Sequence, residues 1–242
     1  MGVDEKDLFV TNSVSFGLRP PGEFSFTLTA PFRYNEGEYS TSNTMEVELY
    51  GLSDLSVEAT WTPSALGWRM GSVAVEPAFV LGLKLGTGEY DRTDDNGDLV
   101  PTRYQLGTGT TCPSFGVKTG LSFSSGPKAW LSLAYQVNGE NGVGYERGDS
   151  LTAVVGFGWT VLDWLHLSPG LSMIAVLQHD RQDGVIVEDS RDEFPYAELA
   201  AKMKVSTRFL LTVYVRCLLS AGGSSSENAQ RQQMGAGFSV HF

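Results

Sequence analysis

Residues 231–242 read RQQMGAGFSVHF, and from Met234 onwards the residue types alternate without a break. One face of an extended chain would carry Met234, Ala236, Phe238, Val240 and Phe242, and the other would carry small or polar residues. A period of two is the pattern of a β-strand, because successive side chains of a strand point to opposite faces. The stretch therefore predicts a closing strand with one apolar face and one small, polar face.

Ten further stretches repeat this alternation. The sequence thus predicts eleven strands, at residues 8–18, 24–34, 45–62, 73–85, 114–123, 131–137, 151–161, 165–177, 197–205, 209–216 and 234–242. The connections are short after every odd-numbered strand and long after every even-numbered one. Outer-membrane barrels have short periplasmic turns and long extracellular loops, whereas a soluble sandwich has no reason to place all its long loops at one end.

These patterns predict an all-β fold, a transmembrane antiparallel up-and-down β-barrel formed by residues 1–242 as one domain in a bacterial outer membrane. Bacterial single-chain barrels have an even number of strands, so we expect about twelve. The missing strand would precede Leu8, residues 2–7 would supply a stub, or the division of residues 35–62 is wrong. The terminal Phe242 resembles the assembly signal of outer-membrane barrels. No charged leader precedes Asp4, so we expect that a signal peptide has been removed.

Composition excludes several other classes of protein. No run of about 18 apolar residues occurs, which argues against a transmembrane helix. The net charge of −11 argues against nucleic-acid binding, because a phosphate backbone requires a basic face. Cys112 and Cys217 are predicted to face opposite sides of the sheet, so we expect no disulfide. His166, His179 and His241 have no partner at metal-ligand spacing, and we expect neither a metal nor a cofactor.

The polar face of the predicted strands consists mainly of Gly, Ser and Thr, with fewer charges than a water-facing sheet carries. We therefore expect the apolar face to contact lipid and the polar face to line an aqueous lumen. Clustering of Phe26, Phe79, Phe157 and Phe238 in a dry centre would contradict this orientation. The predicted pore-lining charged residues are Glu58, Glu76, Lys84, Lys118, Glu198, Lys202, Lys204 and Arg216, with Arg33 and His166 as further candidates. They would form either a selective constriction or ion pairs that only hold the wall.

Aromatic and acidic residues also sort by connection. The Trp residues lie near the short connections and most Tyr residues near the long ones, which predicts two interfacial girdles: Trp61, Trp68, Trp130, Trp159 and Trp164, and Tyr34, Tyr39, Tyr50, Tyr90, Tyr104, Tyr135, Tyr145 and Tyr196. Most of the 28 acidic residues fall in the long connections, taken as 35–50, 87–111, 139–149, 179–194 and 222–230. We therefore expect an acidic extracellular rim.

Two stretches, residues 81–88 (LGLKLGTG) and residues 105–116 with their QLGTG and PSFG segments, resemble a strand, loop and strand signature. The signature is that of outer-membrane proteins associated with the meta-pathway of phenol degradation, and residues 51–55 (GLSDL) are similar to that family's strand opening. The family's Pro-Thr-Gly reads Gly86-Thr87-Gly88 here. The resemblance implies a channel for small, often aromatic or apolar, compounds, distantly similar to long-chain fatty-acid channels. Nothing before Leu8 resembles the amino-terminal plug of those channels.

Three alternatives accompany the main hypothesis. The acidic stretch 91–98 is either a solvated loop or a weak divalent-cation site, although Arg103 stands where an EF-hand needs a bidentate Glu. His179 and Asp180, with Asp183 and Asp192 nearby, would be the dyad of a membrane-embedded hydrolase. The acidic loops would serve a structural or adhesion barrel. We expect instead a monomeric, non-enzymatic channel for passive diffusion, in contact with the bilayer and lipopolysaccharide.

Overall fold

The computed structural model describes residues 8–18, 22–40, 44–94, 96–102, 104–188, 190, 193–206, 209–219 and 232–241. Of the side chains in these ranges, those of residues 8, 9, 38–40, 44, 45, 232–235 and 237–241 are outside the description. Within this part of the chain, no helix combines the length and apolar character that spanning a membrane requires.

One thirteen-stranded sheet makes up almost all of the structure. The predicted strands are all present, at β1 (Leu8–Leu18), β2 (Phe24–Ser40), β3 (Thr44–Leu52), β4 (Leu55–Trp61), β6 (Val73–Leu85), β7 (Cys112–Phe123), β8 (Lys128–Gln136), β10 (Ser150–Leu162), β11 (Leu165–Val176), β14 (Glu193–Lys204), β15 (Phe209–Leu218) and β16 (Gln232–His241). Short elements lie in the connections: η1 (Ser64–Leu66), β5 (Trp68–Met70), β9 (Tyr145–Glu146), β12 (Arg181–Gln182) and β13 (Val185–Ile186).

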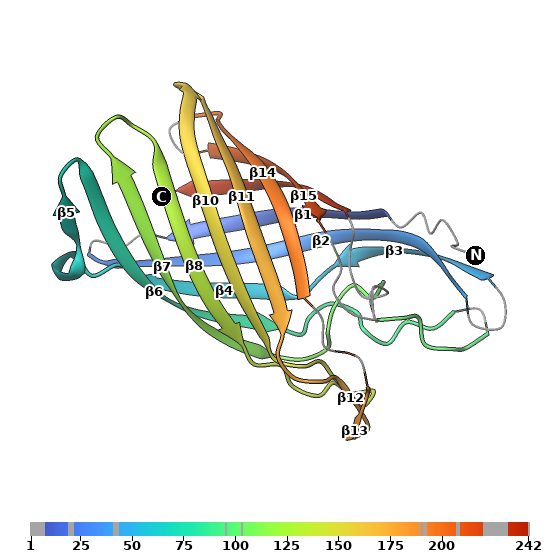
Figure 1. Cartoon of the computed structure of the whole chain (residues 1–242). Helices are drawn as coiled ribbons and strands as arrows, with labels where there is room; N and C mark the ends of the chain where they lie inside the picture. Colours follow the sequence, from blue (N-terminus) through green and yellow to red (C-terminus); the bar gives the residue numbers. More distant parts are fainter. Residues whose placement is uncertain are drawn as a thin grey trace.

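The sheet closes on itself (Figure 1). Each strand pairs with the next around the ring, and β1 pairs with both β2 and β16. β3, β4 and β5 follow one another along a single strand position of the ring, which we call a lane. β3 and β4 both pair with β2, and β4 and β5 both pair with β6. The described residues therefore form eleven lanes. A ring with an odd number of lanes cannot be antiparallel throughout, and the β1–β16 pair is parallel. The residues before Leu8, where a twelfth strand was expected, are outside the description.

The connection predicted at residues 35–50 is a β-ribbon rather than a loop. β2 continues to Ser40, β3 begins at Thr44, and the ladder between them keeps one register from Phe32–Leu52 to Ser40–Thr44. Glu36 and Glu48 face outward on this ribbon, while Val47 and Leu49 face inward and are buried. The sequence pattern was misleading because the outward positions of the ribbon are polar, so the apolar residues here belong to the inner face.

The orientation predicted for the two faces of the sheet is confirmed. Phe26 and Phe79 are each 41% exposed and Phe157 is 40% exposed, all on the outside, while the side chain of Phe238 is outside the description. The same outward apolar belt runs over strands on every side of the ring and includes Phe16, Leu28, Phe115, Leu131, Val155, Leu171, Leu199 and Val213. An apolar belt around a closed sheet is the surface that a bilayer requires.

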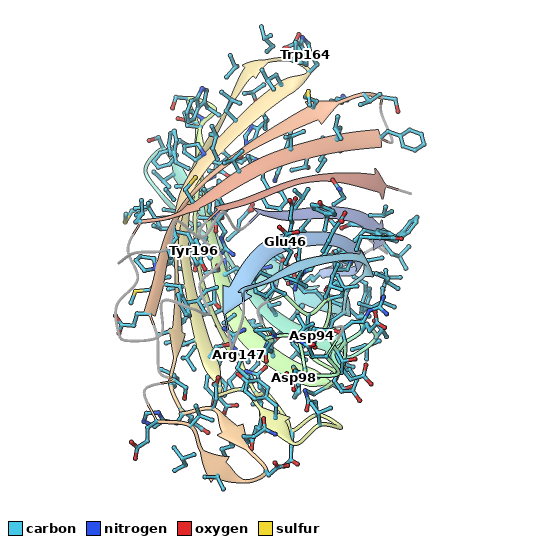
Figure 2. The ribbon with its side chains drawn as sticks, turned by 90° about the vertical axis from the view of Figure 1, so that its right-hand side faces the viewer. Glu46, Asp94, Asp98, Arg147, Trp164 and Tyr196 are labelled. Carbon is cyan, nitrogen blue, oxygen red and sulfur yellow. The ribbon has the colours of Figure 1, made fainter. Side chains whose placement is uncertain are left out.

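The aromatic girdles are only partly as predicted. Trp61, Trp68, Trp159 and Trp164 are exposed on the outer surface, and Trp164 lies at the short turn between β10 and β11 (Figure 2). Trp130 instead faces the lumen, where its ring packs so closely over Gly156 that no Cβ would fit there. Tyr104 and Tyr196 are buried rather than interfacial. Proximity to a connection in the sequence does not settle which face a side chain takes, and both Trp130 and Tyr196 alternate with outward-facing neighbours.

A hydrogen-bonded clasp joins two short connections at the end opposite the long loops. The Glu23 carboxylate accepts hydrogen bonds from Ser64 Oγ and Ser64 N, both at 2.6 Å, and from Trp61 Nε1 at 3.0 Å. These donors, with the Ser64 side chain contributing most, lower the pKa of Glu23.

The orientation of the sheet predicts unequal effects of charge on adjacent residues of β2. Leu28→Arg places a guanidinium against acyl chains and should lower the free energy of unfolding by about 2–4 kcal/mol. Thr27→Arg places the same group in the lumen near Glu58 and should lower it by far less. Urea unfolding in lipid vesicles, followed by tryptophan fluorescence, measures both variants. Equal losses would contradict the assignment of the faces.

The clasp predicts a pH dependence. Because the pKa of Glu23 is lowered in the folded protein, its stabilisation is present above the ordinary Glu pKa of about 4.3 and is lost as the pH falls through the folded value. Ser64→Ala removes the largest cause and should move the Glu23 pKa back toward the ordinary value, as read from a carboxyl NMR titration. Ser124→Ala, in another short turn, is the control. An unchanged Glu23 pKa in Ser64→Ala would rule out the clasp.

Candidate functional site

A β-bulge between β3 and β4 directs a carboxylate into the barrel. Leu52 pairs with Phe32 and Ser56 pairs with Thr29, so β3–β4 spans one residue more than β2 over this interval. The extra residue lies at Ser53–Asp54, and both side chains are buried on the inner side. Bulges of this kind re-aim side chains and are common beside functional sites. The alternation expected through residues 45–62 therefore reverses at this point.

Asp54 anchors the long connection of residues 86–111 inside the barrel mouth. Its Oδ1 accepts a hydrogen bond from Gly88 N at 3.0 Å, and its Oδ2 accepts from Thr108 N at 2.9 Å and Thr108 Oγ1 at 2.7 Å. Lys84 Nζ lies 3.8 Å from Oδ2. Ser53 Oγ donates to the Leu106 carbonyl, and Asn35 Nδ2 donates to the Tyr104 carbonyl at 2.7 Å.

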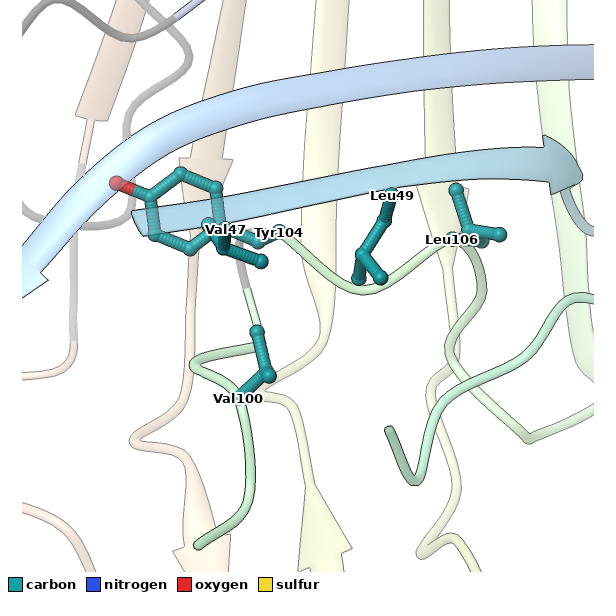
Figure 3. Close-up of a cluster of buried hydrophobic side chains, with 5 residues drawn as sticks. All are labelled: Val47, Leu49, Val100, Tyr104 and Leu106. Atoms are coloured by element: carbon teal, nitrogen blue, oxygen red, sulfur yellow. The ribbon is translucent and has the colours of Figure 1, made fainter. Parts of the chain in front are cut away.

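Apolar packing completes this inward fold of the connection. Val100, Tyr104 and Leu106 pack against Val47 and Leu49 of β3, and all five side chains are buried (Figure 3). Tyr104 is fully buried. A second buried cluster is formed by Val176, Phe194 and Tyr196. The connection thus behaves as an interior wall of the barrel rather than as a solvated external loop.

These elements enclose a cavity of about 330 Å³. Its walls come from the inner faces of β2, β6, β7, β11, β14 and β15 and from the long connections at the same end of the barrel. The polar groups include Asn138, Thr108, Gln105 and the thiol of Cys112, and Ile174, Phe194 and Tyr196 supply apolar surface. A volume of this size is at the lower end of the range for small-molecule sites, which runs from about 300 to 1,000 Å³.

Positive charge predominates among the residues that line the cavity. Arg33, Lys84, Arg147 and Arg216 contribute four cationic groups, against the single carboxylate of Asp54. Arg147 comes from the connection after β9, at the end of the barrel that Figure 2 views. The charge of Arg147 acts on both Arg33 and Lys84. The lining is cationic although the chain carries a net charge of −11.

A hydrogen-bonded cluster fixes Arg216 at one side of the cavity. Arg216 Nε donates to Glu198 Oε1 at 2.7 Å and Nη2 donates to Ser172 Oγ at 2.9 Å, while Ser172 Oγ donates to the same carboxylate oxygen at 2.5 Å. The guanidinium also lies over the ring of Tyr196, with 4.4 Å from Cζ to the ring centroid. Planar pairing and stacking of this kind hold an arginine in one orientation.

The predicted pore-lining residues separate into two groups. Lys84 and Arg216 line the cavity, and Glu198 binds Arg216 at its edge. Glu58 and Lys118 form an ion pair at 2.7 Å nearer the short turns, with both side chains more than two-fifths exposed. Lys202 is opposite His166 across the β11–β14 ladder, Lys204 is at the end of β14, and Glu76 lines a separate pocket beside the β4–β6 connection.

Sequence reasoning left Asp54 and Arg147 out of the predicted site, and gave Arg33 only as a further candidate. Asp54 was assigned to the polar face but not to a site. Arg147 lies in a connection, where periodicity gives no orientation. One signal in the sequence could have located the bulge: Leu52 and Leu55 both face outward at a spacing of three, where an unbroken strand would give two or four.

The alternative sites receive little support from the geometry. Asp180 accepts hydrogen bonds from Tyr145 Oη and from Gly148 N at 2.8 Å, rather than from His179, whose buried Nδ1 has no partner among the described residues. Burial, followed by the Asp180 hydrogen bond, raises the pKa of Tyr145. In the acidic stretch, Asp94 Oδ1 accepts from the backbone of Asn96 and Asp98. Across the described part of the chain, no group of three His, Cys or acidic side chains could hold a metal.

Cys112 and Cys217 are both free thiols. Cys112 is buried on the inner side and lines the cavity. Cys217 lies two residues after the outward-facing Val215 on β15 and therefore shares its outer face. The prediction that they face opposite sides of the sheet is confirmed.

A closed sheet that is antiparallel except at the β1–β16 pair, with an outward apolar belt and a polar, partly filled interior, defines an outer-membrane β-barrel protein. The family model described as "Putative MetA-pathway of phenol degradation" matches residues 9–242. The chain belongs to this family, and the resemblance seen in residues 51–116 is confirmed.

Structural comparison gives the same fold. The chain superposes on the crystal structure of an outer membrane channel from Pseudomonas putida F1 with a TM-score of 0.61, at 14% sequence identity, covering 89% of this chain and 76% of that one. No curated protein sequence matches the chain.

The anchoring role of Asp54 predicts that its removal releases the inner connection. Asp54→Ala deletes three hydrogen bonds to a buried carboxylate, each worth about 1.5–3 kcal/mol. Proteinase K should therefore cut the 86–111 connection at least about tenfold faster than in the parent protein, as followed by mass spectrometry. Asp163→Asn, at the opposite end of the barrel, should leave the cutting rate unchanged. Equal rates in the Asp54 variant and the parent would contradict the anchoring role.

Proposed function

We propose that the protein is an outer-membrane channel for passive diffusion of small solutes, including small aromatic or apolar compounds. The observation that carries this proposal is the cavity of about 330 Å³ inside a closed membrane barrel. At about 30 Å³ of liquid volume per water, such a space accommodates roughly ten water molecules. The similar protein from Pseudomonas putida F1 is described as an outer membrane channel, which supports the same role here.

The lumenal charges would set the selectivity of the channel. The proposed pore-lining set is the one predicted from the sequence, extended by Arg33, Asp54 and Arg147. Glu58–Lys118 and Glu198–Arg216 are paired at 2.7 Å. Exposed pairs of this kind contribute only about 0–1 kcal/mol to stability, so the Glu58–Lys118 pair is better explained by a role in the pore than by one in the fold.

The outer surface supports the proposed partners. Among the described side chains, the apolar belt lies over β1, β2, β7, β8, β10, β11, β14 and β15, which suits a monomer surrounded by lipid. The ribbon of β2 and β3 continues beyond the belt and presents Glu36, Glu48 and Tyr50 outward. We propose that this end faces the extracellular side and contacts lipopolysaccharide, with solutes as the other partners.

The geometry favours a non-enzymatic role. A hydrolase would need a base oriented toward a nucleophile within hydrogen-bond reach, and Asp180 is instead bound by Tyr145 and Gly148. The acidic rim leaves an adhesion role as the alternative, and conductance distinguishes the two.

Planar-bilayer recording of the purified protein tests the channel directly. Discrete open levels are expected, together with a reversal potential set by the lumenal charge. Lys118→Gln and Lys118→Glu change the local charge beside Glu58 by −1 and −2, and should shift the reversal potential in two steps toward cation preference. Lys202→Glu should act in the same direction.

Asp163→Asn, in the short turn between β10 and β11, is the control and should not change the reversal potential. A silent membrane with correctly folded protein would contradict the channel and favour the adhesion barrel, and silence together with lipid or peptide hydrolysis would favour an enzyme. An unchanged reversal potential in the Lys118 and Lys202 variants would remove these residues from the pore.

A further inference from the structure

The cavity at the long-loop end has more positive charge than its fold requires. Asp54 is fully engaged by the inner connection, with three hydrogen bonds and Lys84 at 3.8 Å. Arg216 is held by Glu198 and Ser172. The carboxylates of this region thus contact Lys84 and Arg216. Asp54 also acts on Arg33 through its charge, but no hydrogen bond or ion pair joins Arg33 or Arg147 to a carboxylate among the described residues.

The Nε–H group of Arg33 lacks an acceptor among the described residues. Arg33 lies on the inner face of β2, opposite Gly51, and its Nε atom is buried. A buried donor without an acceptor costs about 1–3 kcal/mol, and more when the group is charged. Such a group is expected where a ligand supplies the acceptor.

Arg147 adds a second cation toward the same space. No hydrogen bond or ion pair holds it within the described part of the chain, and its charge acts on Arg33, Lys84, Tyr145 and Tyr196. Two guanidinium groups that repel each other across a small cavity become favourable together when an anion lies between them. Guanidinium groups suit carboxylates in particular, because their N–H donors match both oxygens.

One side of the cavity is largely apolar. Ile174 of β11 and Phe194 and Tyr196 of β14 line it, with Phe194 and Tyr196 buried. Arg216 covers the Tyr196 ring and fixes its position. The cavity therefore combines a cationic side with a rigid aromatic side within about 330 Å³.

We infer that this cavity is a binding site for a small organic carboxylate, whose carboxyl group binds Arg33 and Arg147 and whose aromatic or aliphatic body packs against Ile174, Phe194 and Tyr196. The inference rests on the proposed channel function and deepens it by naming the class of solute. The acidic loops would then repel the anionic solute from the rim, and the cationic interior would attract it into the barrel.

Benzoate tests the site, with benzamide as a neutral molecule of the same shape. In single-channel recordings in potassium chloride, benzoate should interrupt the current at concentrations where benzamide does not. Arg147→Gln and Arg33→Gln should each weaken this block by about tenfold or more, as expected for loss of a hydrogen-bonded charge. Arg181→Gln, which removes a cation paired with Glu146 in the loops, should leave the block unchanged.

The outcomes separate the site from the channel. Equal block by benzoate and benzamide, or equal block in the parent and in Arg147→Gln, would overturn the carboxylate site while leaving the channel intact. Block by inorganic phosphate as strong as that by benzoate would overturn the role of the apolar wall. If the protein carries no current, the proposed function fails, and calorimetry in detergent then tests the site alone: benzoate binding that is lost in both arginine variants supports it, and no binding in the parent overturns it.

Folding of the variants is checked by the mobility shift on boiling. Arg147→Gln is the more robust variant, because this exposed side chain packs into no buried cluster. Wild-type block in a folded Arg147→Gln therefore overturns the site even if Arg33→Gln does not fold.

Discussion

The structure depends on one constraint, which is that a β-sheet in hydrocarbon cannot leave backbone N–H and C=O groups unpaired. Each unpaired group at membrane depth costs several kcal/mol, because no water is present to replace the missing partner. The ring meets this constraint by pairing β1 with both β2 and β16. With eleven lanes, the last pair has to be parallel, and the parallel register runs from Phe9–Gln233 to Gly17–His241. The other neighbouring strands of the ring follow one another in the sequence, so each strand reverses direction at a turn or a connection and pairs antiparallel with the next.

Closure also decides where the stabilising contacts can lie. Most of the large apolar side chains face outward, and the buried hydrophobic clusters of the described residues lie at one end of the barrel, where the connections fold inward. The Ser53–Asp54 bulge is central to this arrangement, because it places a carboxylate in the lumen and thereby fixes the connection of residues 86–111. The ion pair with Lys84 and the inward fold of the connection, which lines part of the cavity, both follow from that one interruption of the ladder.

Much of the fold could be predicted from the sequence, and less of the site. Alternation identifies strands wherever the two environments differ sharply, so the strands from Val73 to His241 were placed within a few residues. It failed at residues 35–52, where the outward face of the ribbon is polar and the inward face is covered by a connection. Lys84 and Arg216 lie on regular strands, and alternation therefore predicts their inward orientation. Alternation also puts Asp54 on the polar face, but its anchoring role and the position of Arg147 both depend on how the connections fold, which periodicity does not give.

The central claim is that the apolar face of this sheet contacts acyl chains while the other face encloses water. A spin-label scan of residues 151–161 in β10 tests it most directly, in lipid vesicles and in a Cys112→Ser, Cys217→Ser background that leaves one thiol per variant. Labels at Val155, Phe157 and Trp159 should be relaxed mainly by oxygen, which partitions into the bilayer, and labels at Thr152, Val154 and Thr160 mainly by a water-soluble nickel chelate. Labels that show the reverse assignment, or no alternation along the strand, would contradict the claim.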